Sequence, residues 1–157
     1  MSIYYNQRQQ PLKALYDKIE RICLKHVAIA SFDCGDLQTF NADALTFPAA
    51  YLETINQIED NGYTETYSIS LNILDRQVTD ATRTQTILTH DKLKQIFSEI
   101  QAYMMLKKKS FGTIGNASIL LFNDYEDARL VRLRADFTLT VEPLATPLAD
   151  LASIFPD

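Results

Sequence analysis

The sequence predicts an α+β domain in which an antiparallel sheet, made of two hairpins, packs against two amphipathic helices. In two segments the apolar residues recur at intervals of three and four, as they do on one face of an α-helix. In two others apolar and polar residues alternate, as in half-buried strands. The order of elements is helix, hairpin, helix, hairpin, without a sign of parallel βαβ units, so the class is α+β.

The first predicted helix covers Pro11–Val27. Pro11 suits the first turn, where its missing N–H is not needed. The second predicted helix begins between Thr84 and Asp91 and ends near Lys108. The apolar face consists of Leu12, Leu15, Tyr16, Ile19, Ile22, Cys23 and Val27 in the first helix, and of Leu93, Ile96, Phe97, Ile100, Tyr103 and Met104 in the second.

The first hairpin is predicted after a stretch of turn signals at Ser31–Asp43, which has room for one short strand at Leu37–Asn41. Its first strand covers Phe47–Ile58 and opens with Pro48, which is tolerated at a strand start. The turn is Asp60-Asn61-Gly62. The second strand carries Tyr63, Tyr67, Ile69, Leu71 and Ile73 on one face, and Thr64, Thr66, Ser68, Ser70 and Asn72 on the other.

The second hairpin is predicted from Ala117–Phe122 and Leu130–Glu142, joined by an acidic turn. A loop at Gly112–Gly115 precedes it. In its second strand the inward positions are Val131, Leu133, Ala135, Phe137, Leu139 and Val141, and the outward ones are Arg132, Arg134, Asp136, Thr138, Thr140 and Glu142. The predicted core contains Leu15, Ile19, Ile96, Phe97, Ile100, Leu133, Phe137 and Leu139.

Residues 1–143 are therefore expected to form a single domain, followed by an apolar C-terminal tail at 144–157. Pro143 ends the last strand, so the tail cannot simply extend it. Five large apolar residues are too many for a solvated terminus: Leu144, Leu148, Leu151, Ile154 and Phe155. The tail must bury them on its own domain or on a neighbouring subunit.

The composition excludes several classes of protein. A chain of 157 residues buries about 70% of its unfolded surface and needs no metal or disulfide to fold. The net charge of −5 argues against a general nucleic-acid binder. Cys23 and Cys34 form no CxxC pair, so a disulfide scaffold is not indicated. The sequence has no signal peptide or long apolar run, and we expect the chain to stay in the cytoplasm where it is made and to have no membrane partner.

The sequence offers little for catalysis or for cofactors. It has neither a GxGxxG nor a P-loop motif, and His26 and His90 lack the spacing of metal ligands. His90-Asp91 is interpreted as a surface histidine beside a helix N-cap. Cys34 is interpreted as a loop cysteine, whose pKa the flanking Asp33 and Asp36 would raise. We therefore expect no metal, no cofactor and no catalytic residue.

The candidate residues are those for contacts between subunits. Lys107-Lys108-Lys109 either complements the C-terminal end of the second helix or contacts an acidic partner or a phosphate backbone. The other candidates are in the apolar tail: Leu148, Leu151, Ile154 and Phe155.

The order of elements, over roughly residues 10 to 143, resembles the tail-terminator and tail-completion (neck) proteins of long-tailed phages and related contractile particles. The resemblance is carried by four features after the N-terminal helix. They are the Phe-Pro strand Phe47-Pro48-Ala49-Ala50-Tyr51, the strand Tyr67–Asp75, the long helix, and the hairpin that runs from Tyr125–Leu130 into the alternating strand Arg132–Val141.

The resemblance implies a ring-forming subunit, typically a hexamer, which caps the tail tube or joins it to the head of a virion. Its partners would be copies of itself and tail-tube or head-connector proteins, with DNA only passing through a channel. No cofactor or catalytic residue is implied. Two alternatives stay open: a small cytoplasmic enzyme or ligand-binding domain, and an adaptor that binds a partner protein.

Overall fold

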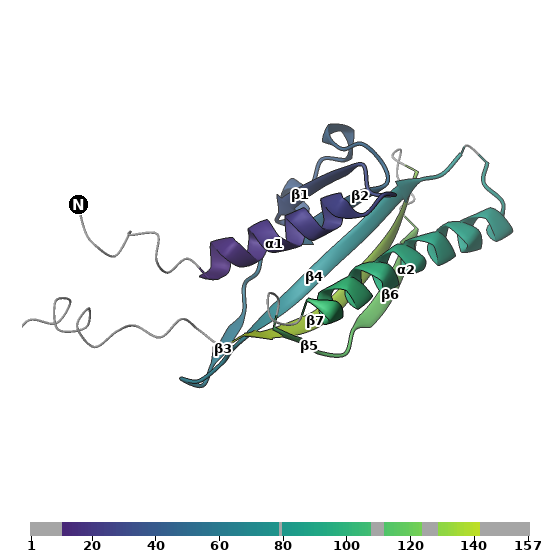
Figure 1. Ribbon diagram of the computed structural model, residues 1–157. Helices are drawn as coiled ribbons and strands as arrows, with labels where there is room; N and C mark the ends of the chain where they lie inside the picture. Colours follow the sequence, from purple (N-terminus) through teal and green to yellow (C-terminus); the bar gives the residue numbers. More distant parts are fainter. Residues whose placement is uncertain (1–10, 79, 108–111, 124–128, 142–157) are drawn as a thin grey trace, which may run out of the picture.

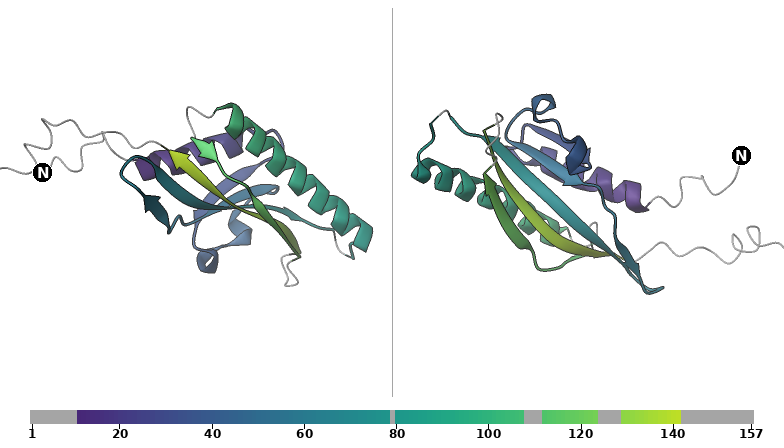
Figure 2. Two further views of the ribbon diagram at one scale, coloured as in Figure 1. Left: turned by 90° about the horizontal axis from the view of Figure 1, so that it is seen from below. Right: turned by 180° about the vertical axis from the view of Figure 1, so that it is seen from behind.

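The computed structural model describes residues 11–78, 80–107, 112–123 and 129–141. They form a twisted sheet with both helices, α1 (Pro11–Lys25) and α2 (Arg83–Leu106), on one of its faces (Figures 1 and 2). The strands are β1 (Ser31–Gly35), β2 (Ala49–Glu53), β3 (Ile58–Asp60), β4 (Glu65–Arg76), β5 (Thr113–Ile114), β6 (Ser118–Asn123) and β7 (Leu130–Val141). The α+β class is thus confirmed.

The centre of the sheet is the antiparallel pair β4–β7. Its register runs through all twelve residues of each strand, from Glu65 opposite Val141 to Arg76 opposite Leu130. On the other side of β4 lie β2 and β3, and on the other side of β7 lie β5 and β6. The predicted alternation of β7 is confirmed, since its inward residues pack with the helices in one core.

The sheet is mixed, which corrects the prediction of two antiparallel hairpins. Strand β1 pairs with β2 in parallel, from Ser31 opposite Ala49 to Gly35 opposite Glu53. Two 3-10 turns, Leu37–Thr39 and Ala42–Ala44, bring the chain back so that it enters β2 in the same direction. The short strand predicted at Leu37–Asn41 is therefore wrong.

The first hairpin keeps its predicted partner but not its boundaries. Both β2 and β3 pair antiparallel with β4, and Asn61 forms the turn by accepting hydrogen bonds from the N–H groups of Tyr63 and Thr64. The strand predicted over Phe47–Ile58 is broken between β2 and β3, where Ile55 donates its N–H to the Tyr16 hydroxyl instead. Tyr63 was expected to point inward, but it lies in this turn and is exposed.

The two helices lie close to their predicted positions. Helix α1 ends at Lys25, so Val27 follows the helix and is exposed instead of joining the apolar face. Helix α2 begins at Arg83, slightly before the expected start, because Thr82 and Gln85 form a capping box. The Thr82 hydroxyl accepts from the Gln85 N–H at 3.1 Å, and the Gln85 side chain accepts from the Thr82 N–H at 2.7 Å. Within the described part of the chain, neither helix is long and apolar enough to span a membrane.

Strand β5 occupies part of the segment that was predicted to be a loop. Its two residues pair with β7 opposite Thr140 and Leu139. Gly112 and Gly115 flank it, and a Cβ atom at either position would overlap Thr140 or Thr138 of β7. These glycines let the chain approach β7 closely, so that the β-branched residues Thr113 and Ile114 between them can join the sheet.

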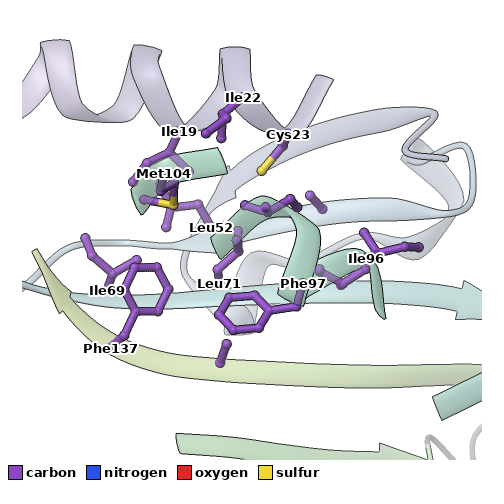
Figure 3. Close-up of a cluster of buried hydrophobic side chains, with 14 of the residues drawn as sticks. Ile19, Ile22, Cys23, Leu52, Ile69, Leu71, Ile96, Phe97, Met104 and Phe137 are labelled. Carbon is purple, nitrogen blue, oxygen red and sulfur yellow. The ribbon is translucent and has the colours of Figure 1, made fainter. Parts of the chain in front are cut away.

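The core lies between the helices and the sheet, where side chains from α1, α2, β2, β4 and β7 meet (Figure 3). All eight residues of the predicted core are buried. Phe97 of α2 packs on Phe137 of β7, with 5.9 Å between the ring centroids. The N-terminal part of α2 contributes nothing to this core, and Ile87 and Leu88 there are exposed.

Replacing Phe97 with alanine should therefore lower the free energy of unfolding by about 3–5 kcal/mol, as expected for a large-to-small change in a core. Leu88→Ala on the exposed part of the same helix is the matched control and should change it by less than about 0.5 kcal/mol. Urea titrations of the three chains measure both values. Equal losses in the two variants would contradict the observed orientation of α2.

Candidate functional site

Neither α1 nor α2 covers the opposite face of the sheet (Figure 2). Part of this face is covered by Phe40, Ala42 and Phe47, which pack on Tyr51, Leu74 and Leu130, and the rest carries a connected group of polar side chains. It is formed by the outward positions of β2, β4 and β7, which the register places side by side. We call Glu53, Ser70, Asn72, Arg132, Arg134 and Asp136 the polar network. Beside it lies a small pocket. These two features and the two edges of the sheet form the candidate site.

Asn72 is at the centre of the polar network. It is fully buried, and it is the only polar residue of the described chain classed as buried. Its Nδ2 donates to Oε2 of Glu53 at 2.9 Å and to the carbonyl of Tyr51 at 3.3 Å, while its Oδ1 accepts from Nη1 of Arg132 at 2.9 Å. The amide thus ties β2 to β7 through the strand between them. Its burial is compatible with stability because both ends of the amide are hydrogen-bonded.

Arg134 forms the second half of the network. Its Nε lies 3.1 Å from Oε2 of Glu53 and 3.0 Å from Oδ1 of Asp136, and its Nη2 donates to the Ser70 hydroxyl at 3.3 Å. The Ser70 hydroxyl in turn donates to Asp136 at 2.6 Å. The proton of the Ser70 hydroxyl is thus bound by a carboxylate, and the printed contacts of His26 and His90 lie outside the network.

The pocket has a volume of about 210 Å³ and lies at the end of the sheet where β7 begins. Its walls are mostly apolar, with Arg132 and Asn72 on one side: Leu37, Phe40, Tyr51, Asn72, Leu74, Leu130 and Arg132. The Tyr51 ring meets Phe40 edge-on at 4.9 Å between centroids, and its hydroxyl donates to the Asp36 carbonyl. The pocket is thus held open by side chains that are themselves fixed.

Arg132 combines two fixed contacts at this pocket. Its guanidinium lies 4.1 Å from the centroid of the Phe122 ring, in a cation–π arrangement, and it also bonds Asn72. An arginine oriented in this way can recognise a carboxylate or another acidic group with little loss of side-chain entropy.

The two edges of the sheet differ from each other. Among the described residues, β1 pairs only with β2 and β6 pairs only with β7, so these strands lie at opposite sides of the molecule (Figure 1). Strand β6 exposes a leucine on each face, with 46% of Leu120 and 50% of Leu121 accessible. The His90 side chain reaches the carbonyl of Phe122 at 3.3 Å, which covers one end of this edge.

Of the residues predicted for subunit contacts, the structure describes one. Lys107 is the exposed C-cap of α2, and its ammonium lies 5.8 Å from the centroid of the Tyr103 ring. The other predicted contact residues lie outside the described part of the chain: Lys108, Lys109, Leu148, Leu151, Ile154 and Phe155. Of the acidic turn predicted at 123–127, Asn123 ends β6 and the other four residues lie outside the described part, as does the tail at 144–157.

The two histidines are structural and lie apart. The Nδ1 atom of His26 accepts from the Ala28 N–H at 3.1 Å, so its Nε2 can donate to Glu99 at 3.2 Å and link α1 to α2. His90 and Asp91 lie inside α2, which corrects their interpretation as residues beside an N-cap, because Thr82 caps this helix. In the described part of the chain, no three His, Cys, Asp or Glu residues cluster so that they could hold a metal ion.

The sequence had suggested that Cys34 lies in a loop. In the structure it lies on the edge strand β1. Burial raises the pKa of its thiol, and the carboxylates of Asp33 and Glu20 raise it further. Burial in the core raises the pKa of Cys23 to about 12. Both thiols are thus poor nucleophiles at neutral pH.

The sequence predicted the polar face but not the network within it. The sequence predicted the alternating polar residues of β4 and β7 and the pairing of β4 with the segment that contains Glu53, but not the pairing of β4 with β7. The available signal for the network was the set of polar residues at the outward positions of the two strands: Ser70, Asn72, Arg132, Arg134 and Asp136. No protein-family model matches the sequence, and no curated protein matches it.

The polar network predicts a cost for removing its central amide. Asn72→Leu should lower the free energy of unfolding by about 1–3 kcal/mol, because the half-buried side chains of Glu53 and Arg132 each lose one hydrogen-bond partner. Ser68→Ala, on the same face of the same strand, is the control and should cost less than about 0.5 kcal/mol. A neutral result for Asn72→Leu in urea titration would show that water replaces the amide.

The thiol environments predict a distinct pattern of chemical modification. In the native protein a thiol reagent should modify Cys34, which is exposed, but not Cys23, and both should react in urea. Asp33→Asn should speed the reaction of Cys34 at pH 8, since the lost carboxylate lowers the thiol pKa and increases the thiolate fraction. Asp43→Asn, at an exposed site elsewhere, should leave the rate unchanged. Modification of Cys23 at the rate of Cys34 in the native state would contradict the observed packing.

Proposed function

We propose that the chain is a structural, ring-forming subunit of a phage or phage-like neck or tail, which caps the tail tube or joins it to the head and performs no catalysis. The observation that carries the proposal is the presence of two different sheet edges, β1 and β6, at opposite sides of the domain. Its setting would be a virion assembled in the host cytoplasm.

Two different edges favour a head-to-tail assembly. An edge strand presents unpaired N–H and C=O groups that another strand can pair with. If β6 of one copy pairs with β1 of the next, the contact joins two unlike surfaces, and repetition of such a contact closes a ring when the rotation allows it. The strands are similar in length, with six residues in β6 and five in β1.

The side chains of β6 support the same arrangement. Leu120 lies on the open face and Leu121 on the helix face, because neighbouring residues of a strand point to opposite faces. A strand placed beside β6 would cover both leucines at once. Natural edge strands usually carry charges or prolines that prevent such pairing, whereas the sequence of β6 is Ser-Ile-Leu-Leu-Phe-Asn.

The charge of the chain suits a ring through which DNA passes. A net charge of −5 disfavours adhesion to phosphates, since like charges repel. The proposed partners are therefore copies of the chain itself, in a hexameric ring, and tail-tube or head-connector proteins. DNA would only pass through the channel.

A second candidate function is that of a small enzyme or ligand-binding domain. The pocket beside Arg132 favours it, because apolar walls with one oriented cation are typical of sites for small acidic molecules. The volume of about 210 Å³ is, however, below the roughly 300–1,000 Å³ of pockets that hold drug-sized ligands. Such a domain would remain a monomer and bind its ligand at Arg132.

The proposal predicts an oligomer that depends on β6. The unmodified protein should form a concentration-dependent species of roughly six times the chain mass of 17.9 kDa, seen by light scattering and as rings in electron micrographs. Leu120→Lys should abolish this species while changing the free energy of unfolding by less than about 0.5 kcal/mol, since Leu120 is exposed in the monomer.

Tyr63→Lys is the matched control, because it places the same charge on an exposed residue in the turn between β3 and β4, outside both β1 and β6. It should leave the oligomer intact. A monomer at all concentrations, or an oligomer that Leu120→Lys does not weaken, would contradict the proposal.

A further inference from the structure

We propose that the pocket beside Arg132 binds the C-terminal segment of a second copy of this chain. In this arrangement the ring of Phe155 enters the apolar part of the pocket, and the carboxylate of Asp157 meets the Arg132 guanidinium. The inference rests on the self-assembly proposed above and adds the pair of surfaces through which neighbouring copies are linked.

The size and walls of the pocket suit one large apolar side chain. A volume of about 210 Å³ lies below the range of pockets for drug-sized ligands but accommodates an aromatic ring. Phe40 and Tyr51 already form an edge-on pair at its wall, and a third ring could add to it in the same geometry. Leu37 at the rim is 39% accessible, so a bound side chain would also cover apolar surface that is now in water.

The charges of the pocket match the end of the segment. The sequence from position 154 reads Ile-Phe-Pro-Asp, which places a carboxylate two residues after the aromatic ring. In an extended segment such residues point to the same side, about 7 Å apart, and Pro156 between them has a φ that fits an extended chain. The pocket has the same sequence of features, with apolar walls followed by the guanidinium that Phe122 and Asn72 orient. A carboxylate there gains charge-assisted hydrogen bonds.

The distances favour the pocket of a second copy over that of the same chain. The pocket lies at the Leu130 end of β7, and the segment follows Val141 at the other end, about 37 Å away along a strand of twelve residues. The 14 residues from 142 to 155 span at most about 50 Å, so a return to the pocket of the same chain would use most of that length.

The shortest path from Val141 to the pocket of the same chain also crosses a surface that is too polar for the apolar segment. It runs over the open face of the sheet, which carries Thr66, Ser68, Ser70 and Thr138. Leu144, Leu148 and Leu151 would there face hydroxyl groups and the ions of the polar network, which gives them no apolar surface to bury against. A segment that binds a neighbouring copy does not have to lay these leucines along the polar face of its own sheet.

Disulfide trapping between two differently tagged full-length chains tests the inference. Both carry Cys34→Ser, so that the buried Cys23 is their only native thiol. One chain also carries Leu37→Cys at the pocket rim, and the other Pro156→Cys. Under mild oxidation we expect a disulfide between the two tags. Arg132→Gln in the first chain should slow its formation by about tenfold or more, because a charge-assisted interaction is lost.

Tyr63→Cys replaces Leu37→Cys as the matched control, since it offers an exposed thiol away from the pocket, and it should give only background cross-linking. A chain that carries both Leu37→Cys and Pro156→Cys measures the intramolecular alternative. A disulfide within that single chain, equal rates for the pocket and control thiols, or insensitivity to Arg132→Gln would overturn the inference. Thermal melting of each variant establishes that it is folded.

The two proposals fail separately. If rings form without the pocket cross-link, the segment does not bind there, although the ring function stands. If the cross-link forms between copies but no ring appears, the segment binds in this pocket and the ring function is wrong.

Discussion

The pairing of β4 with β7 is the constraint on which the rest of the structure depends. Twelve residue pairs hold the two strands in one register, and every other strand except β1 pairs with one of these two. Because side chains alternate along both strands, this register places one set of residues under α1 and α2 and the other set on the open face. A slip of a single residue would exchange the two sets, so the apolar core itself fixes the register.

The same register assembles the polar network and the pocket. Asn72 lies opposite Arg134 and diagonal to Arg132, and Ser70 lies opposite Asp136, so that hydrogen bonds follow from strand pairing alone. Each charge of the network has a partner of opposite charge or an amide beside it, which offsets the cost of partial burial. The network therefore strengthens the pairing of strands and also fixes the arginine that borders the pocket.

The sequence predicted the parts of the fold that local patterns determine. The apolar periodicity of α1 and α2 and the alternation of Leu130–Val141 depend on nearby residues, and the core that they predict is buried. The parallel pairing of β1 with β2 and the burial of Asn72 depend on partners distant in the chain, so no local pattern encodes them. The pocket was not predictable for the same reason, since its walls come from four separate segments.

The distribution of polar groups separates the surfaces that could serve a partner from those that serve the fold. The helices cover one face of the sheet, and the charges of Glu53, Arg134 and Asp136 are used on one another. Two other surfaces of the described chain place apolar and polar groups side by side: the exposed leucines beside the backbone of the edge strand β6, and the apolar pocket walls beside Arg132. Each of these surfaces contains apolar area that a partner could bury and a polar group that could hydrogen-bond to it. Protein interfaces contain the same two kinds of surface.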